Sequence, residues 1–127
     1  MKIMVSCLLY ASTEPIPYAS HCQFWYRLGK SMPDVEFYFQ SPWRVPIDSA
    51  RNQSVLKALE LGCDYIFFYD NDMILDPETI PRLLARDKPA ICGRYTIRGY
   101  PFNSAILRFH TSEAYIPSFS RTQLDRL

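Results

Sequence analysis

Apolar runs alternate with amphipathic segments from the start of the chain to Gly93, and this alternation predicts its regular structure. Four of the runs have the length and composition of buried β-strands. These runs are residues 3–10, 35–40, 65–69 and 90–92. Between them, apolar residues recur at spacings of three and four residues, which is typical of helices that bury one face. The pattern therefore predicts an α/β fold with a mostly parallel sheet.

The first predicted helix covers residues 20–28, with Ser20 as its N-cap. Its apolar residues share one face of the helix and are Phe24, Trp25 and Leu28. The preceding segment, residues 11–17, contains Pro15 and Pro17. Because proline interrupts both helices and strands, we expect a loop between the first strand and this helix.

Two further helices are predicted from their end signals. The second begins with Asp48 or Ser49 as N-cap and stops at Gly62. Its apolar residues are Ala50, Val55, Ala58, Leu59 and Leu61. The third runs to about residue 86, with Asp76 as N-cap and Pro77 as its first residue. Pro81 would cost a hydrogen bond in such a helix, so Thr79 is the alternative N-cap. After Gly93, loose alternation predicts an antiparallel hairpin over residues 94–109, followed by an irregular tail.

The run at residues 65–69 ends in two carboxylates, Asp70 and Asp72, with an amide between them. Five consecutive apolar or aromatic residues predict a central strand that is buried on both faces. In open parallel sheets, ligands bind beyond the carboxyl ends of the strands. Carboxylate oxygens at such a place favour a divalent cation, because like charges placed together need a compensating partner. We therefore expect the functional site at this strand end.

The length, charge and aromatic content of the chain limit its domain organisation and the kinds of ligand that it can bind. A chain of 127 residues predicts a single domain, with residues 1–93 as the α/β part and residues 94–127 as the hairpin and tail. The formal net charge of +1 provides no field for nucleic acid, and no nucleic-acid-binding motif is present. An aromatic fraction of 15% suits a ligand groove that is lined with rings.

The four cysteines are far apart and form no Cys-x-x-Cys motif. This spacing favours unpaired thiols in a reducing compartment, which predicts a cytoplasmic protein. The apolar run at the N-terminus is too short for a transmembrane helix and lacks a signal-peptide cleavage region. We expect no transmembrane segment, although the sequence leaves peripheral membrane contact open.

The order of these features resembles the nucleotide-sugar half of a GT-A glycosyltransferase of the family 2 kind. The resemblance covers about residues 2–101. It is carried first by a predicted helix that contains Ala-Arg-Asn at residues 50–52 and by the buried strand that ends in Asp-Asn-Asp. A helix that begins with proline follows, and then the sequence Pro-Ala-Ile-Cys-Gly at residues 89–93. It implies a Rossmann-like three-layer sandwich, short or truncated at its C-terminus compared with the family.

The resemblance also implies a function, a metal-dependent glycosyltransferase that uses a UDP- or GDP-sugar and Mn²⁺ or Mg²⁺. Asp72 would ligate the metal, while Asp70 would support the ion and contact the ribose or the donor sugar. Arg51 would reach the diphosphate, and the loop after the first strand, with Tyr10 and Ser12, would hold the nucleotide. The acceptor is an unknown glycan, lipid or protein.

The catalytic base of the family has no clear counterpart in this chain. Inverting members carry an acidic base in their second half, and often a histidine that completes the metal site. After Lys88, the carboxylates are Glu113 and Asp125, and the late histidine is His110. The second predicted strand closes with Gln40, where many members hold the nucleotide base with an acidic residue.

Two other functions are compatible with the same residues. The short chain suits a non-catalytic nucleotide-sugar-binding or interaction module that kept the donor half alone. An Asp-x-Asp strand end is also typical of haloacid-dehalogenase-like phosphohydrolases, whose first Asp is the nucleophile. That family places the motif on its first strand and has Thr or Val where Ile74 stands here.

Overall fold

A computed structural model describes residues 1–9 and 15–93, and the strands at residues 107–109 and 115–117. The chain divides into two compact units, Met1–Ala85 and Arg86–Leu127. In the second unit, β4 (Leu107–Phe109) and β5 (Tyr115–Pro117) pair in antiparallel fashion. Most of the predicted hairpin, at residues 94–106, lies outside the described residues.

The first unit is built on a sheet of three parallel strands in the order β2-β1-β3. The strands are β1 (Lys2–Leu8), β2 (Glu36–Gln40) and β3 (Tyr65–Asp70). The predicted α/β class with a parallel sheet is confirmed. The predicted central position of residues 65–69 is wrong, because β1 is central and β3 is a half-buried edge strand of the described sheet. The apolar content of a strand determines neither how far it is buried in the described sheet nor its place in the strand order.

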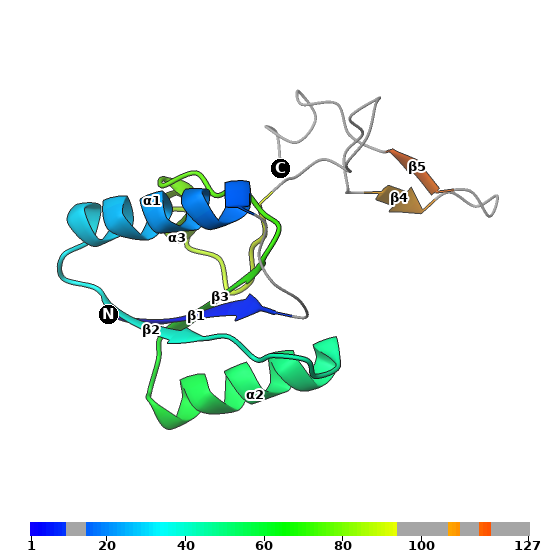
Figure 1. Cartoon of the computed structure of the whole chain (residues 1–127), viewed down its shortest axis with the longest axis horizontal. Coiled ribbons are helices and arrows are strands. Elements are labelled where there is room, and N and C mark those ends of the chain that lie inside the picture. Colours follow the sequence, from blue (N-terminus) through cyan, green and yellow to red (C-terminus); the bar gives the residue numbers. More distant parts are fainter. Residues whose placement is uncertain (10–14, 94–106, 110–114, 118–127) are drawn as a thin grey trace. The chain divides into compact units, whose positions relative to one another are not determined.

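Helices cover both faces of this sheet, which gives the first unit three layers (Figure 1). The helices are α1 (Pro15–Ser31), α2 (Ile47–Glu60) and α3 (Thr79–Leu84). Helices α1 and α3 lie on one face and α2 lies on the other. The main hydrophobic core lies on the α1 side, where Phe24 and Leu28 pack with Ile3 and Val5 of β1.

Helix α2 packs on the opposite face through small side chains. Ala50, Ser54 and Ala58 recur every fourth residue and are buried, and the Ser54 hydroxyl lies 2.8 Å from that of Ser6 on β1. The predicted apolar face of this helix is therefore only partly correct, because Leu59 is 71% exposed. Val55 is likewise an exposed residue. Because small residues occupy the face of α2 that meets the sheet, the helix axis can approach the sheet closely. The larger apolar side chains of α2 lie on its exposed side.

Helix α1 starts earlier than we predicted from the positions of the prolines. It begins at Pro15, and both Pro15 and Pro17 lie in its first turn. A first turn has no intrahelical partners for its N–H groups, so proline costs no hydrogen bond there. Ser20 lies inside the helix and is not its N-cap, and its hydroxyl accepts a hydrogen bond from the Leu75 N–H at 3.2 Å.

For α2, the predicted C-terminal end at Gly62 is confirmed, whereas the predicted N-cap is not. The N-cap is Pro46, with no hydrogen bond from a capping side chain, so the expected cap at Asp48 or Ser49 is wrong. At the other end, Gly62 has φ +64°, and its N–H donates to the Leu59 carbonyl. The next N–H donates to the Ala58 carbonyl, which completes a Schellman motif.

Two later predictions also need correction. Helix α3 begins at Thr79, and the Asp76 carboxylate accepts the N–H of Glu78 at 2.8 Å just before it. The predicted N-cap at Asp76 is therefore wrong, because the N-cap is Glu78 and Pro77 precedes the helix. Residues 90–92 form no strand, since no described strand is hydrogen-bonded to them.

Candidate functional site at the carboxyl ends of β1 and β3

The strand order creates a topological switch point between β1 and β3. The chain leaves β1 through α1 to reach β2 on one side, and then returns through α2 to β3 on the other side. Because these connections diverge, a crevice forms beyond the carboxyl ends of the two strands. Leu8 and Asp70 are register partners there, so the acidic strand end lies beside the end of the central strand.

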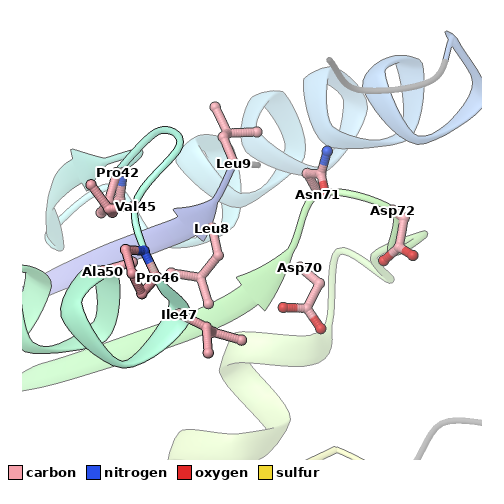
Figure 2. A pocket seen from close by; sticks show the side chains of 10 residues that line it. All are labelled: Leu8, Leu9, Pro42, Val45, Pro46, Ile47, Ala50, Asp70, Asn71 and Asp72. Carbon is pink, nitrogen blue, oxygen red and sulfur yellow. The ribbon is translucent and has the colours of Figure 1, made fainter. Parts of the chain in front are cut away.

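A pocket of about 460 Å³ occupies this place (Figure 2). Its volume lies within the usual range for small-molecule sites. One wall comes from the ends of β1 and β3, and the other from the loop before α2 and the first turn of that helix. The lining residues are Leu8, Leu9, Pro42, Val45, Pro46, Ile47, Ala50, Asp70, Asn71 and Asp72. The pocket is therefore apolar on the α2 side and acidic where β3 ends.

The wall before α2 is held against the end of β1 by backbone hydrogen bonds. The Leu9 N–H donates to the Pro42 carbonyl, and the Arg44 N–H donates to the Leu9 carbonyl, each at 3.1 Å. Leu9 and Trp43 form an isolated parallel bridge between these bonds. Arg44 has φ 52°, an uncommon conformation for a residue with a side chain. These contacts extend the central strand and place Pro42 and Val45 at the pocket.

The acidic residues sit in a turn that directly follows β3. The Met73 N–H donates to the Asp70 carbonyl at 3.1 Å, so the chain reverses across Asn71 and Asp72. Figure 2 shows the Asp70 and Asp72 side chains on the same side of this turn and the Asn71 side chain on the other. Both carboxylates are exposed to solvent. The turn can therefore present two carboxylates in the same direction.

This donor set fits a hard divalent cation that also binds phosphate. Within the described parts of the chain, no group of three or more His, Cys, Asp or Glu side chains could hold a metal ion. Mg²⁺ is usually bound by one or two carboxylates, with water and substrate phosphate oxygens as the other ligands. Asp70 and Asp72 would supply the protein ligands of such a site, while a closed structural metal centre would need more.

Next to the acidic turn lies a group of polar side chains that are buried or half-buried. Burial raises the pKa of the Cys7 thiol, a hydrogen bond with the Tyr69 hydroxyl opposes this shift, and the charge of Asp70 adds to it. Burial also raises the pKa of the Tyr69 phenol, and its hydrogen bond with Cys7 acts in the same direction. Both groups are therefore neutral at physiological pH.

His21 belongs to this group, and its role was missed from the sequence. It is 8% exposed, and its Nε2 lies 2.7 Å from the Met73 carbonyl oxygen. Its ring meets that of Tyr69 edge-on, with centroids 5.0 Å apart. His21 precedes Phe24 by three residues, and this spacing places it on the buried face of α1. That spacing is the signal that could have identified it.

The other expected site residues have different outcomes. Arg51 is exposed on α2, one residue after Ala50, and does not line the pocket. Its contact with a diphosphate stays a prediction. Five expected residues lie outside the described residues, namely Tyr10, Ser12, His110, Glu113 and Asp125. The apolar wall before α2 was not predicted, although the prolines at positions 42 and 46 indicated a rigid loop.

Two general comparisons complete the description. None of the helices in the described parts of the chain has both the length and the apolar character needed to cross a membrane. Comparison of the chain with models of protein families, with characterised proteins and with solved structures gave no match.

Proposed function

We propose that this protein binds a nucleoside-diphosphate sugar with Mn²⁺ or Mg²⁺ and transfers the sugar to an acceptor. The observation that carries the proposal is the position of Asp70 and Asp72. Asp70 ends a strand at the switch point of a parallel sheet, Asp72 lies in the turn that follows, and both line a pocket whose other wall is apolar. The resemblance of the sequence motifs to GT-A glycosyltransferases supports the same function.

Each part of the pocket suits one part of such a donor. The apolar wall from Leu8 and Pro42 to Ile47 offers surface to the nucleoside. The first turn of α2 lies at the same pocket, and its N-cap, Pro46, makes no capping hydrogen bond through its side chain. Exposed N–H groups at a helix start favour an anion, so this turn suits the diphosphate.

Asp70 and Asp72 would hold the cation. When bound, the cation would neutralise the negative charge that develops on the leaving diphosphate. Asp70 would also accept a hydrogen bond from a ribose or sugar hydroxyl. Arg51, Tyr10 and Ser12 are the further donor contacts that we propose from the sequence. Glu113 and Asp125 are the candidates for the catalytic base.

The proposal predicts that nucleotide binding depends on the metal. UDP or GDP at 100 times its dissociation constant should stabilise the native state by about 2.7 kcal/mol when Mn²⁺ is present. Without Mn²⁺ we expect little stabilisation, and Asp72→Asn should remove it. Thermal unfolding of each variant, with and without each nucleotide and Mn²⁺, measures these shifts.

Asp34→Asn is the matched control for this experiment. Asp34 is also an exposed aspartate, but it lies in the turn between α1 and β2, at the opposite edge of the sheet. Its variant should keep the full shift. An equal shift in the Asp72→Asn and wild-type proteins would refute the role of the acidic pair.

A second measurement separates a transferase from a binding module. Release of free sugar from a UDP- or GDP-sugar by the wild-type protein, lost in Asp72→Asn, would show catalysis. Binding without release over a range of donors and acceptors would favour the non-catalytic alternative. Hydrolysis of a simple phosphomonoester would instead favour a phosphohydrolase.

A further inference from the structure

Two neighbouring side chains of α1 hold the backbone that follows the acidic turn. The Leu75 N–H donates to the Ser20 hydroxyl at 3.2 Å, and His21 Nε2 lies 2.7 Å from the Met73 carbonyl oxygen. A carbonyl oxygen can only accept, so the Nε2 atom carries a hydrogen and donates it. The two bonds lie on either side of Ile74 and attach this segment to α1.

His21 contacts the chain on both sides of the acidic pair. Its ring packs edge-on against Tyr69, the residue before Asp70. Its hydrogen bond reaches Met73, the residue after Asp72. One buried side chain therefore fixes the points at which the acidic turn leaves the strand and rejoins the body of the first unit.

The acidic turn and the segment after it are irregular in structure. The hydrogen bond from the Met73 N–H to the Asp70 carbonyl closes it, and residues 71–75 are part of no helix or strand. Segments outside helices and strands generally open locally at lower cost than the core elements. The anchors at Met73 and Leu75 therefore contribute to the directions of the two carboxylates.

We propose that Ser20 and His21 are positioning residues for cation and nucleotide binding. By fixing the backbone at Met73 and Leu75, they hold the Asp70 and Asp72 carboxylates in the arrangement that a divalent cation requires. Mg²⁺ in particular demands near-ideal geometry, so small displacements of its ligands weaken binding. This inference rests on the proposed function of the acidic pair.

Two pairs of variants separate positioning from simple loss of packing. His21→Leu removes the donor to Met73, whereas His21→Gln keeps an amide N–H at a similar reach from the backbone. Ser20→Ala removes the acceptor for the Leu75 N–H, whereas Ser20→Thr keeps a hydroxyl. Within each pair, the two variants differ mainly in one hydrogen-bonding group.

The first readout is the affinity for Mn²⁺ in the presence of UDP, measured from the free Mn²⁺ signal in electron paramagnetic resonance. Loss of an outer partner of a metal ligand typically weakens metal binding by about 10- to 100-fold. Because His21 and Ser20 hold the backbone beside the ligands and not the ligands themselves, we expect the lower end of this range, about tenfold, for His21→Leu and a smaller loss for Ser20→Ala. His21→Gln and Ser20→Thr should restore most of the affinity.

The second readout needs no ligand. Amide hydrogen exchange at Leu75 should accelerate in Ser20→Ala, because its acceptor is lost, and should return towards the wild-type rate in Ser20→Thr. Exchange at Met73 should accelerate in His21→Leu, because the turn that this N–H closes would lose its outer anchor.

Ile3→Val is the control for general destabilisation, since Ile3 is buried at the amino end of β1, opposite the acidic turn. It should leave Mn²⁺ affinity unchanged. If His21→Leu and Ser20→Ala both bind Mn²⁺ with the affinity of the wild-type protein, the positioning role is overturned. Unchanged hydrogen exchange at Leu75 and Met73 in these variants would overturn it as well. Absence of Mn²⁺ and UDP binding in the wild-type protein would instead overturn the proposed function itself.

Discussion

The two faces of the β2-β1-β3 sheet are packed in different ways. On the α1 side, large side chains interlock, and Trp25 meets Phe24 and Phe39 edge-on, with ring centroids 4.6 and 4.7 Å apart. On the α2 side, small side chains approach β1, and the buried polar contact is the Ser6–Ser54 pair. One face is a thick aromatic layer, and the other is a close helix–strand contact.

The difference shows how stability and the candidate site are divided between the faces. Burial of large apolar area provides most of the folding free energy, and here that area lies mainly on the α1 side. The close approach of α2 instead places its first turn beside the end of β1, where Ile47 and Ala50 line the pocket. Helix α1 also contributes to the site, through the bonds from Ser20 and His21 to the segment after the acidic turn.

The largest expected effect is loss of the aromatic layer. Phe24 is 0% exposed, so Phe24→Ala should lower the free energy of unfolding by about 3–5 kcal/mol through lost burial and a residual cavity. Tyr26→Ala is the control, because Tyr26 lies on the same helix but is 65% exposed. Urea unfolding measures both variants. Similar losses in the two would contradict the assignment of the buried face of α1.

An intermediate effect is expected at the serine pair on the α2 side. The Ser54 hydroxyl donates to the Ala50 carbonyl at 3.0 Å, so the Ser6 hydroxyl donates to Ser54. Ser54→Ala would leave the buried Ser6 hydroxyl without an acceptor and should cost about 1–3 kcal/mol.

A double-mutant cycle sharpens this prediction. Removing both hydroxyls leaves no unsatisfied partner, so Ser6→Ala combined with Ser54→Ala should cost no more than Ser54→Ala alone. Unfolding free energies of the two single variants and the double variant measure the coupling. Strictly additive losses would show that the two hydroxyls act independently.

The smallest expected effect is a pH dependence from the aromatic side. The folded-state pKa of the Cys7 thiol lies above its ordinary value of 9.0, chiefly because of burial. Well below pH 9 the thiol is neutral in both states, so it adds no pH dependence there. Above pH 9 the unfolded chain loses this proton more readily than the folded one, so stability should fall as pH rises.

Comparison with Cys7→Ala isolates this contribution, because other groups that titrate at high pH remain in both proteins. The wild-type free energy of unfolding should fall more steeply between pH 9 and 10.5 than that of Cys7→Ala. Cys22→Ala is the matched control, since Cys22 is an exposed free thiol. Equal slopes in wild type and Cys7→Ala would show that the thiol is not shielded from solvent.

Local sequence signals predicted the existence and type of most described elements of the first unit. Apolar runs identified β1, β2 and β3, and Gly62 marked the end of α2, because each signal depends on the residues of that segment alone. Boundaries were less accurate. Pro15 and Pro17 suggested a loop, yet the first turn of a helix accepts proline without loss of a hydrogen bond.

The candidate site was predicted in part. Asp70 and Asp72 were identified because they directly follow an apolar strand, and a strand end in a parallel sheet is a recurrent ligand position. The sequence did not predict the apolar wall from Pro42 to Ala50 or the anchors at Ser20 and His21. These contacts join residues that are far apart in the chain, as His21 and Met73 are.

By itself, the sequence determined that this chain alternates strands and helices up to Asp72 and that one strand ends in an acidic pair. Tertiary structure decided that β1 is the central strand, that α2 packs through Ala50, Ser54 and Ala58, and that α1 holds the segment after the acidic turn. The physical reason is the range of the interactions. Periodicity and end signals act over a few residues, whereas strand order, burial on a chosen face and anchoring hydrogen bonds depend on segments that meet only after the chain has folded.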